Sequence, residues 1–114
     1  MPCVIIPSFE SEEWMKKIEA IVRKEKFQDI YKVLEKSGIG GVTVLEARGF
    51  GRHRNGLRDK VKLEIYVDEF QIEKVVEMIR QIAKTGETGD GKIAILPLEN
   101  LYRIRTGEQG AAAI

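Results

Sequence analysis

The sequence has little of what marks secreted, membrane or nucleic-acid-binding proteins. It contains a single cysteine, Cys3, so no disulfide can form within one chain and no oxidising compartment is required. No apolar run approaches the roughly 20 residues that span a bilayer, so we expect no direct membrane insertion. The 19 basic and 18 acidic side chains give a formal charge of +1, without the basic excess of a dedicated nucleic-acid binder. The first residues lack the basic segment and cleavage site of a signal peptide, and we expect a cytoplasmic protein.

Metal ligands and aromatic side chains are also scarce. His53 is the only histidine, which argues against a metal site within one chain. Aromatic residues make up 7% of the sequence, and only Tyr66 and Tyr102 are candidates for stacking on nucleic-acid bases. The segment 51–60, GRHRNGLRDK, clusters five basic side chains, His53 included, and keeps an RNA-binding module open as a weaker alternative.

What is present suits one folded domain. The chain has 114 residues, of which 43% are apolar and 32% charged, a composition typical of a packed globular protein. Residues 1–14 contain Pro2, Pro7 and several serine and glutamate side chains, which predicts a flexible N-terminal extension. We therefore expect the domain to comprise residues 15–114.

Hydrophobic periodicity predicts alternating strands and helices from residue 15 onwards. Apolar and polar residues alternate, as in strands, over residues 15–22, 41–48, 60–67 and 92–96. The same pattern over residues 101–105 predicts a short fifth strand. Residues 26–37 and the segment between Asp68 and Gly86 have apolar residues three and four apart, as in amphipathic helices. This β-α-β-β-α-β order, plus a short extra strand, predicts an α+β fold, the ferredoxin-like split βαβ. Its open sheet face is available to ligands or further subunits, and we expect oligomerisation.

Two glycine-rich segments carry fixed charge. In Gly49-Phe50-Gly51-Arg52 the glycines let backbone N–H groups approach an anion; a plain turn is the alternative. The segment 85–93, TGETGDGKI, nearly matches a phosphate-binding P-loop, but Ile93 replaces its Ser or Thr and a helix precedes it. A P-loop NTPase is therefore excluded, while a backbone cradle for phosphate and an ordinary turn both remain open.

A third segment, RIRTGE at 103–108, places two arginines on one face of the expected fifth strand. Arg103 and Arg105 could grip a polyphosphate there, or could simply be solvated at the end of an edge strand. Together with Arg52, Lys92 and the glycine amides, they match the needs of a nucleoside triphosphate.

In combination, four segments of the chain closely resemble the PII signal-transduction proteins of nitrogen regulation. They are GFGR (49–52), KVKLEI (60–65), TGETGDGKI (85–93) and RIRTGE (103–108). The resemblance covers residues 15–114. It implies a homotrimer of ferredoxin-like subunits that binds ATP or ADP competitively in clefts between neighbours. It also implies a T-loop, between the second and third strands, that contacts a target protein.

The resemblance also implies roles for individual residues. The phosphate contacts would be Gly49, Gly51 and Arg52 at the base of the T-loop, Gly89, Gly91 and Lys92 of the B-loop, and Arg103 and Arg105 from across the subunit boundary. Thr43 would face the adenine, and Lys60 would meet the carboxylate of 2-oxoglutarate.

The T-loop departs from the family pattern. It comprises only residues 53–59, about a dozen fewer than usual, and has no tyrosine for uridylylation. His53 stands where the family has a glutamine that helps hold Mg²⁺ and 2-oxoglutarate, and hard cations prefer oxygen ligands. The substitution weakens the expectation of 2-oxoglutarate and Mg²⁺ binding and leaves that of nucleotide binding intact. The expected partner-binding residues are His53, Arg54, Asn55, Leu57 and Arg58.

These observations favour a regulator over an enzyme, because no base–nucleophile pair lies near the glycine segments. The target would be a transporter, an enzyme or another regulator in nitrogen or related metabolism. One alternative is a nucleotide-dependent regulator unrelated to nitrogen and 2-oxoglutarate, for example of a membrane transporter. A small phosphate-processing enzyme is a weaker alternative.

Overall fold

The computed structural model describes residues 14–52 and 56–114. Most of the expected N-terminal extension, and His53, Arg54 and Asn55 of the T-loop, lie outside this part of the chain. In the part described, no helix is long and apolar enough to cross a membrane.

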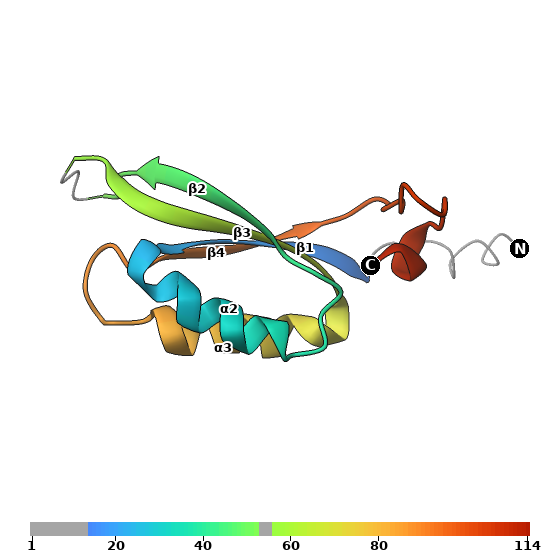
Figure 1. The fold of residues 1–114 in the computed structure, drawn as a ribbon, viewed down its shortest axis with the longest axis horizontal. Helices are drawn as coiled ribbons and strands as arrows, with labels where there is room; N and C mark the ends of the chain where they lie inside the picture. The colour runs from blue at the N-terminus through green and yellow to red at the C-terminus, as the bar shows by residue number, and fades with distance from the viewer. Residues whose placement is uncertain (1–13, 53–55) are drawn as a thin grey trace, which may run out of the picture.

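Two helices cover one face of a four-stranded sheet (Figure 1). The elements are β1 (Met15–Arg23), α2 (Phe27–Glu35), β2 (Thr43–Gly49), β3 (Arg58–Asp68), α3 (Ile72–Ala83) and β4 (Gly91–Pro97), with short 3₁₀ turns at Lys24–Lys26, Glu69–Gln71 and Gly110–Ala113. The sheet order is β2-β3-β1-β4, and every neighbouring pair is antiparallel. The α+β ferredoxin-like fold expected from the sequence is confirmed.

The core lies between the helices and the alternate residues of the two central strands. Ile18 of β1 is paired with Ile65 of β3, and both are fully buried. Beneath them Leu34 of α2 and Ile79 of α3 are equally buried, so each helix contributes one apolar stripe to a single core.

The opposite sheet face carries charges together with exposed apolar side chains, among them Ile21, Leu45 and Leu96. Lys17 Nζ lies 2.8 Å from Glu19 and 3.2 Å from Glu64, and Lys62 Nζ lies 3.4 Å from Glu64. The hydrogen bond between Lys17 and Glu19 raises the pKa of the lysine and lowers the pKa of the carboxyl. Ion pairs within and between the two central strands thus organise the charged part of the open face.

Local sequence signals mark two helix ends. Asp68 and Gln71 form a capping box before α3, in which the Gln71 side chain accepts a hydrogen bond of 3.1 Å from the Asp68 N–H. Gly38, after α2, has a φ of 85°, which is the left-handed conformation that terminates helices.

The expected fifth strand over 101–105 is wrong as a member of the sheet. Only Tyr102 and Gln109 form an isolated bridge there, and the chain reverses between them. The Arg103 N–H donates to the Glu108 carbonyl and the Gly107 N–H to the Arg103 carbonyl, both at 2.8 Å. Gly107 has a φ of 76°, so the turn ends the extended segment before it can pair with β4. Residues 98–114 form an arm that continues beyond the end of the sheet (Figure 1).

Two neighbouring residues of α2 test the position of the core. Leu34 is 1% exposed and Val33 is 37% exposed. We expect Leu34→Ala to lower the free energy of unfolding by about 2–5 kcal/mol, because it leaves a cavity. Val33→Ala should cost less than about 1 kcal/mol. Denaturant unfolding followed by circular dichroism measures both, and equal losses would contradict this core.

Candidate functional site

A cleft of about 1100 Å³ opens at the end of the sheet where β1 ends and the β2–β3 connection begins. Its walls come from three segments far apart in the sequence: the end of β1 with the turn after it, the β2–β3 connection, and the B-loop (residues 84–92), which runs into the start of β4. Figure 1 shows the last two at the same end of the molecule. We call this the glycine-loop cleft.

Most of the sequence-predicted site residues meet in this cleft. Those that line it are Gly49, Gly51, Arg52, Leu57, Arg58, Lys60, Gly89, Gly91 and Lys92. Basic side chains outnumber acidic ones: Arg23, Lys24, Arg48, Arg52, Arg58, Lys60 and Lys92 line it, against Glu25, Asp59 and Glu87. The cleft is therefore suited to an anionic ligand.

Three other predicted residues lie elsewhere in the subunit. Thr43 begins β2, at the strand end away from the cleft, and Arg103 and Arg105 belong to the arm beyond the opposite end of the sheet (Figure 1). The two arginines are not on one face of a strand, contrary to expectation, because Arg105 lies in the turn formed by residues 104–106. Arg103 Nη2 instead donates to the Ile114 carbonyl at 2.9 Å, and Nη1 lies 3.7 Å from Glu108.

Asp90 organises the B-loop. Its carboxylate accepts hydrogen bonds from the Thr85 N–H at 2.8 Å, the Thr85 hydroxyl at 2.5 Å and the Gly86 N–H at 2.9 Å. These bonds, the Thr85 hydroxyl foremost, lower the pKa of Asp90 far below its ordinary range. The observed bonds are those of a turn residue that closes the loop on itself.

Two cations hold the B-loop carbonyls. Arg23 Nη2 donates to the Thr88 carbonyl at 2.6 Å, and Lys60 Nζ donates to the Gly89 carbonyl at 2.7 Å. The role of Arg23 was missed from the sequence, because nothing local distinguishes it from other basic residues after the first strand. Only the β1–β3 register, in which Arg23 faces Lys60, reveals it.

Gly91 has to be glycine. Its φ is 105°, and a Cβ at this position would lie 1.8 Å from the Ile21 carbonyl oxygen. No side chain can be accommodated there without displacing β1 from β4. The B-loop therefore enters β4 with its backbone pressed directly against β1.

Among the described ranges 14–52 and 56–114, no three His, Cys, Asp or Glu side chains gather as a metal site requires. Both carboxylate oxygens of Asp90 accept hydrogen bonds from the B-loop itself. The chemistry offered by the cleft is anion binding by cations and backbone amides.

Fold and cleft together define the class: a ferredoxin-like subunit with two glycine segments beside a basic cleft. A family model described as nitrogen regulatory protein P-II matches residues 15–108. The chain belongs to the P-II family.

Individual relatives agree with this assignment. The chain is 42% identical to the nitrogen regulatory protein P-II of Azospirillum brasilense and 44% identical to that of Synechocystis, covering 88% of this chain and all of each relative. The structure of Arabidopsis thaliana PII bound to citrate is 46% identical, with a TM-score of 0.79 over 90% of this chain and 94% of that one. A B. subtilis GlnK-ATP complex is 32% identical, with a TM-score of 0.79 over 88% and 95%. The chain is thus a regulatory protein and not an enzyme.

The low pKa of Asp90 makes a prediction about the B-loop. A carboxyl with a lowered pKa contributes its stabilisation above its unfolded-state pKa and loses it as pH falls through the folded-state value. We expect the Thr85 and Gly86 amides to keep their protection from hydrogen exchange down to about pH 4, corrected for the intrinsic rate. Asp90→Asn should speed their exchange about tenfold at neutral pH.

Asp59→Asn is the matched control for this measurement by NMR. Asp59 is 69% exposed and lies 4.0 Å from Arg48, so its neutralisation should leave the B-loop amides unchanged. Equal exchange in wild type and Asp90→Asn would show that Asp90 does not hold the loop.

Proposed function

We propose that this chain is a homotrimeric PII signal-transduction protein that binds ATP or ADP in the glycine-loop cleft and regulates a target protein through its short T-loop. The observation that carries the proposal is the convergence of both glycine segments on one basic cleft. The B. subtilis relative was solved as a complex with ATP, which supports a nucleotide as the ligand. Residues 15–114 would form this domain, and residues 1–14 an extension to it.

The phosphates would be bound from both walls of the cleft. Gly49, Gly51 and Arg52 lie on the T-loop side, and Gly89, Gly91 and Lys92 on the B-loop side. Glycine backbones let a phosphate approach the amides closely, and the arginine and lysine neutralise its charge.

The nucleotide would require a second subunit. Thr43, Arg103 and Arg105 lie away from the cleft of their own chain, so they reach an adenine or a phosphate only in a neighbour's cleft. The arm carrying the arginines extends beyond the sheet, where Ile104 is fully exposed (Figure 1). This arrangement supports a trimer whose clefts are completed between subunits.

Signalling would follow from linkage between the ligand and the T-loop. Gly49, Gly51 and Arg52 precede the loop directly, so a ligand that prefers one loop geometry shifts the population of loop states. About 1.4 kcal/mol of preference changes that ratio tenfold. Leu57 and Arg58 are exposed and would be read by the target, together with His53, Arg54 and Asn55. The target is a transporter, an enzyme or another regulator.

A nucleotide sensor without a 2-oxoglutarate response is the second candidate. Lys60, the expected carboxylate ligand, already donates to the Gly89 carbonyl. His53 also replaces the family glutamine, which weakens Mg²⁺ and 2-oxoglutarate binding together. This observation favours regulation by the ATP/ADP ratio, outside nitrogen metabolism if the target is unrelated to it.

Calorimetric titration with ATP and with ADP, each with Mg²⁺ and with or without saturating 2-oxoglutarate, tests both candidates. We expect a dissociation constant on the order of micromolar for both nucleotides. Strengthening by 2-oxoglutarate for ATP alone would indicate a carbon-and-energy sensor. Indifference would indicate an energy sensor. Absence of nucleotide binding would refute the proposed function and leave the family assignment standing.

Arg103→Ala tests the shared cleft. Loss of a charge-assisted contact from the neighbouring subunit should weaken nucleotide binding at least about tenfold. The trimer should persist in light scattering. Arg80→Ala, at an exposed position of α3, is the control and should bind as wild type does. Unchanged affinity in Arg103→Ala would place the arm outside the nucleotide site.

A further inference from the structure

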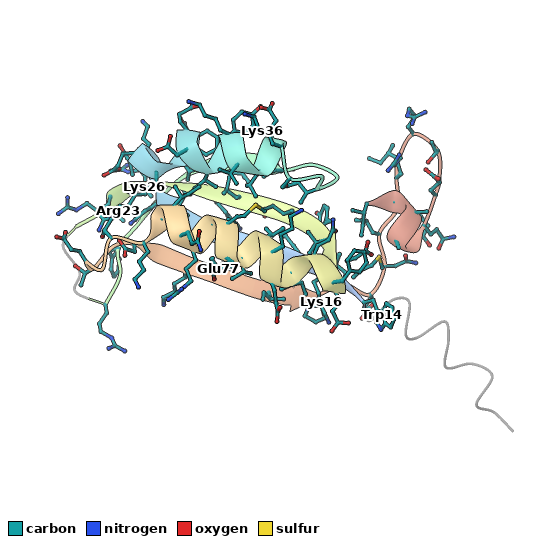
Figure 2. All side chains as sticks on the ribbon, turned by 90° about the horizontal axis from the view of Figure 1, so that it is seen from below. Trp14, Lys16, Arg23, Lys26, Lys36 and Glu77 are labelled. Atoms are coloured by element: carbon teal, nitrogen blue, oxygen red, sulfur yellow. The ribbon has the colours of Figure 1, made fainter. Side chains whose placement is uncertain are left out.

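Arg23 is bound to the B-loop at two points. Its Nη2 donates to the Thr88 carbonyl at 2.6 Å, and its Nε lies 3.4 Å from Asp90 Oδ1. The side chain is 24% exposed, whereas that of Arg48, another arginine lining the cleft, is 66% exposed. Figure 2 shows Arg23 at the end of the sheet beside the loop that leads into β4. The guanidinium of Arg23 thus contacts the B-loop through both a carbonyl and a carboxylate.

A second cation lies directly across the sheet. Arg23 is paired with Lys60 in the β1–β3 register, and like charges in such a pair repel each other. The B-loop compensates both, because Thr88 and Gly89 present consecutive carbonyls to Arg23 and Lys60 and Asp90 adds a negative charge. The two strand ends therefore form a clamp on the loop backbone.

This clamp fixes the orientation of the loop amides. Because a peptide unit is planar, holding the Thr88 carbonyl also sets the N–H of Gly89, and holding the Gly89 carbonyl sets the N–H of Asp90. Gly89 has a φ of 96°, and a Cβ there would lie 3.2 Å from Arg23 Nη2. The loop backbone thus lies against the guanidinium, with no side chain between them.

We propose that Arg23 is a positioning residue that sets the affinity of the glycine-loop cleft for nucleotide phosphates by holding the B-loop through Thr88 and Asp90. The inference rests on the proposed function for its ligand. It assigns Arg23 an indirect role, distinct from a phosphate contact such as that expected of Lys92. An arginine suits this role because its planar fork donates to a carbonyl and a carboxylate at once, which a lysine ammonium cannot do with the same geometry.

A double-mutant cycle separates positioning from direct contact. We expect Arg23→Lys and Asp90→Asn each to weaken ADP binding about tenfold, and the double variant to lose little more than either alone. A direct phosphate contact by Arg23 would instead be largely rescued by lysine, so Arg23→Lys would bind ADP nearly as wild type does. Two independent tenfold losses would multiply to about 100-fold in the double variant, which would contradict a shared positioning role. Calorimetry on the full chain measures all four affinities, and light scattering checks the assembly.

Lys24→Ala is the charge control. Lys24 is exposed and also lines the cleft, so its removal lowers the local positive charge without touching the B-loop carbonyls. Its loss of affinity should stay below about threefold. A loss equal to that of Arg23→Lys, or wild-type affinity in Arg23→Lys, would overturn the inference.

Hydrogen exchange without nucleotide keeps the two proposals distinguishable. Arg23→Lys should speed exchange of the Thr85 and Gly86 amides about tenfold, while Lys24→Ala leaves it unchanged. If wild type binds no ADP, the proposed function fails, and faster exchange in Arg23→Lys still supports the clamp. Unchanged exchange in Arg23→Lys would refute the clamp whatever the nucleotide result.

Discussion

The antiparallel pairing of β1 with β3 is the interaction on which the rest of the structure depends. Its register turns Ile18 and Ile65 towards the helices, and a slip of β1 by one residue would turn Ile18 to the opposite face. The same register brings Arg23 opposite Lys60 at the strand ends. Two facing cations would weaken a sheet, but here carbonyls of the B-loop accept their hydrogen bonds. The pairing of β1 with β3 therefore fixes both the core and the positions of Arg23 and Lys60 in the cleft.

The fold could be predicted because its signals are local and consistent. Strict alternation over 60–67 and three-to-four spacing after Asp68 each correspond to one element of the structure. The error at 101–105 has a physical origin. Alternation reports which faces a strand would have, but a sheet also requires a partner edge within reach. The turn at Gly107 closes the segment on itself before such an edge is met.

The cleft could be predicted in part for a similar reason. Glycines next to charged residues are visible in the sequence, and Gly51, Gly89 and Lys92 do meet in space. Arg23 escaped notice because its contacts with Thr88 and Asp90 span more than sixty residues and depend on strand register. Thr43 and Arg105 remain predictions, since one subunit alone does not bring them to the cleft.

The single tryptophan of the chain has an optical consequence. Trp14 is 54% exposed and precedes β1, at the strand end opposite Arg23 (Figure 2). Arg23 is the last of the nine residues of β1, so the two lie roughly 30 Å apart, far beyond direct contact between an indole and a ligand in the cleft of the same subunit. Intrinsic tryptophan fluorescence therefore reports on the surroundings of Trp14, at the arm end of the subunit. A change in emission when ligand is added would report rearrangement there, including contacts with neighbouring subunits, rather than direct contact with ligand in the cleft of the same subunit.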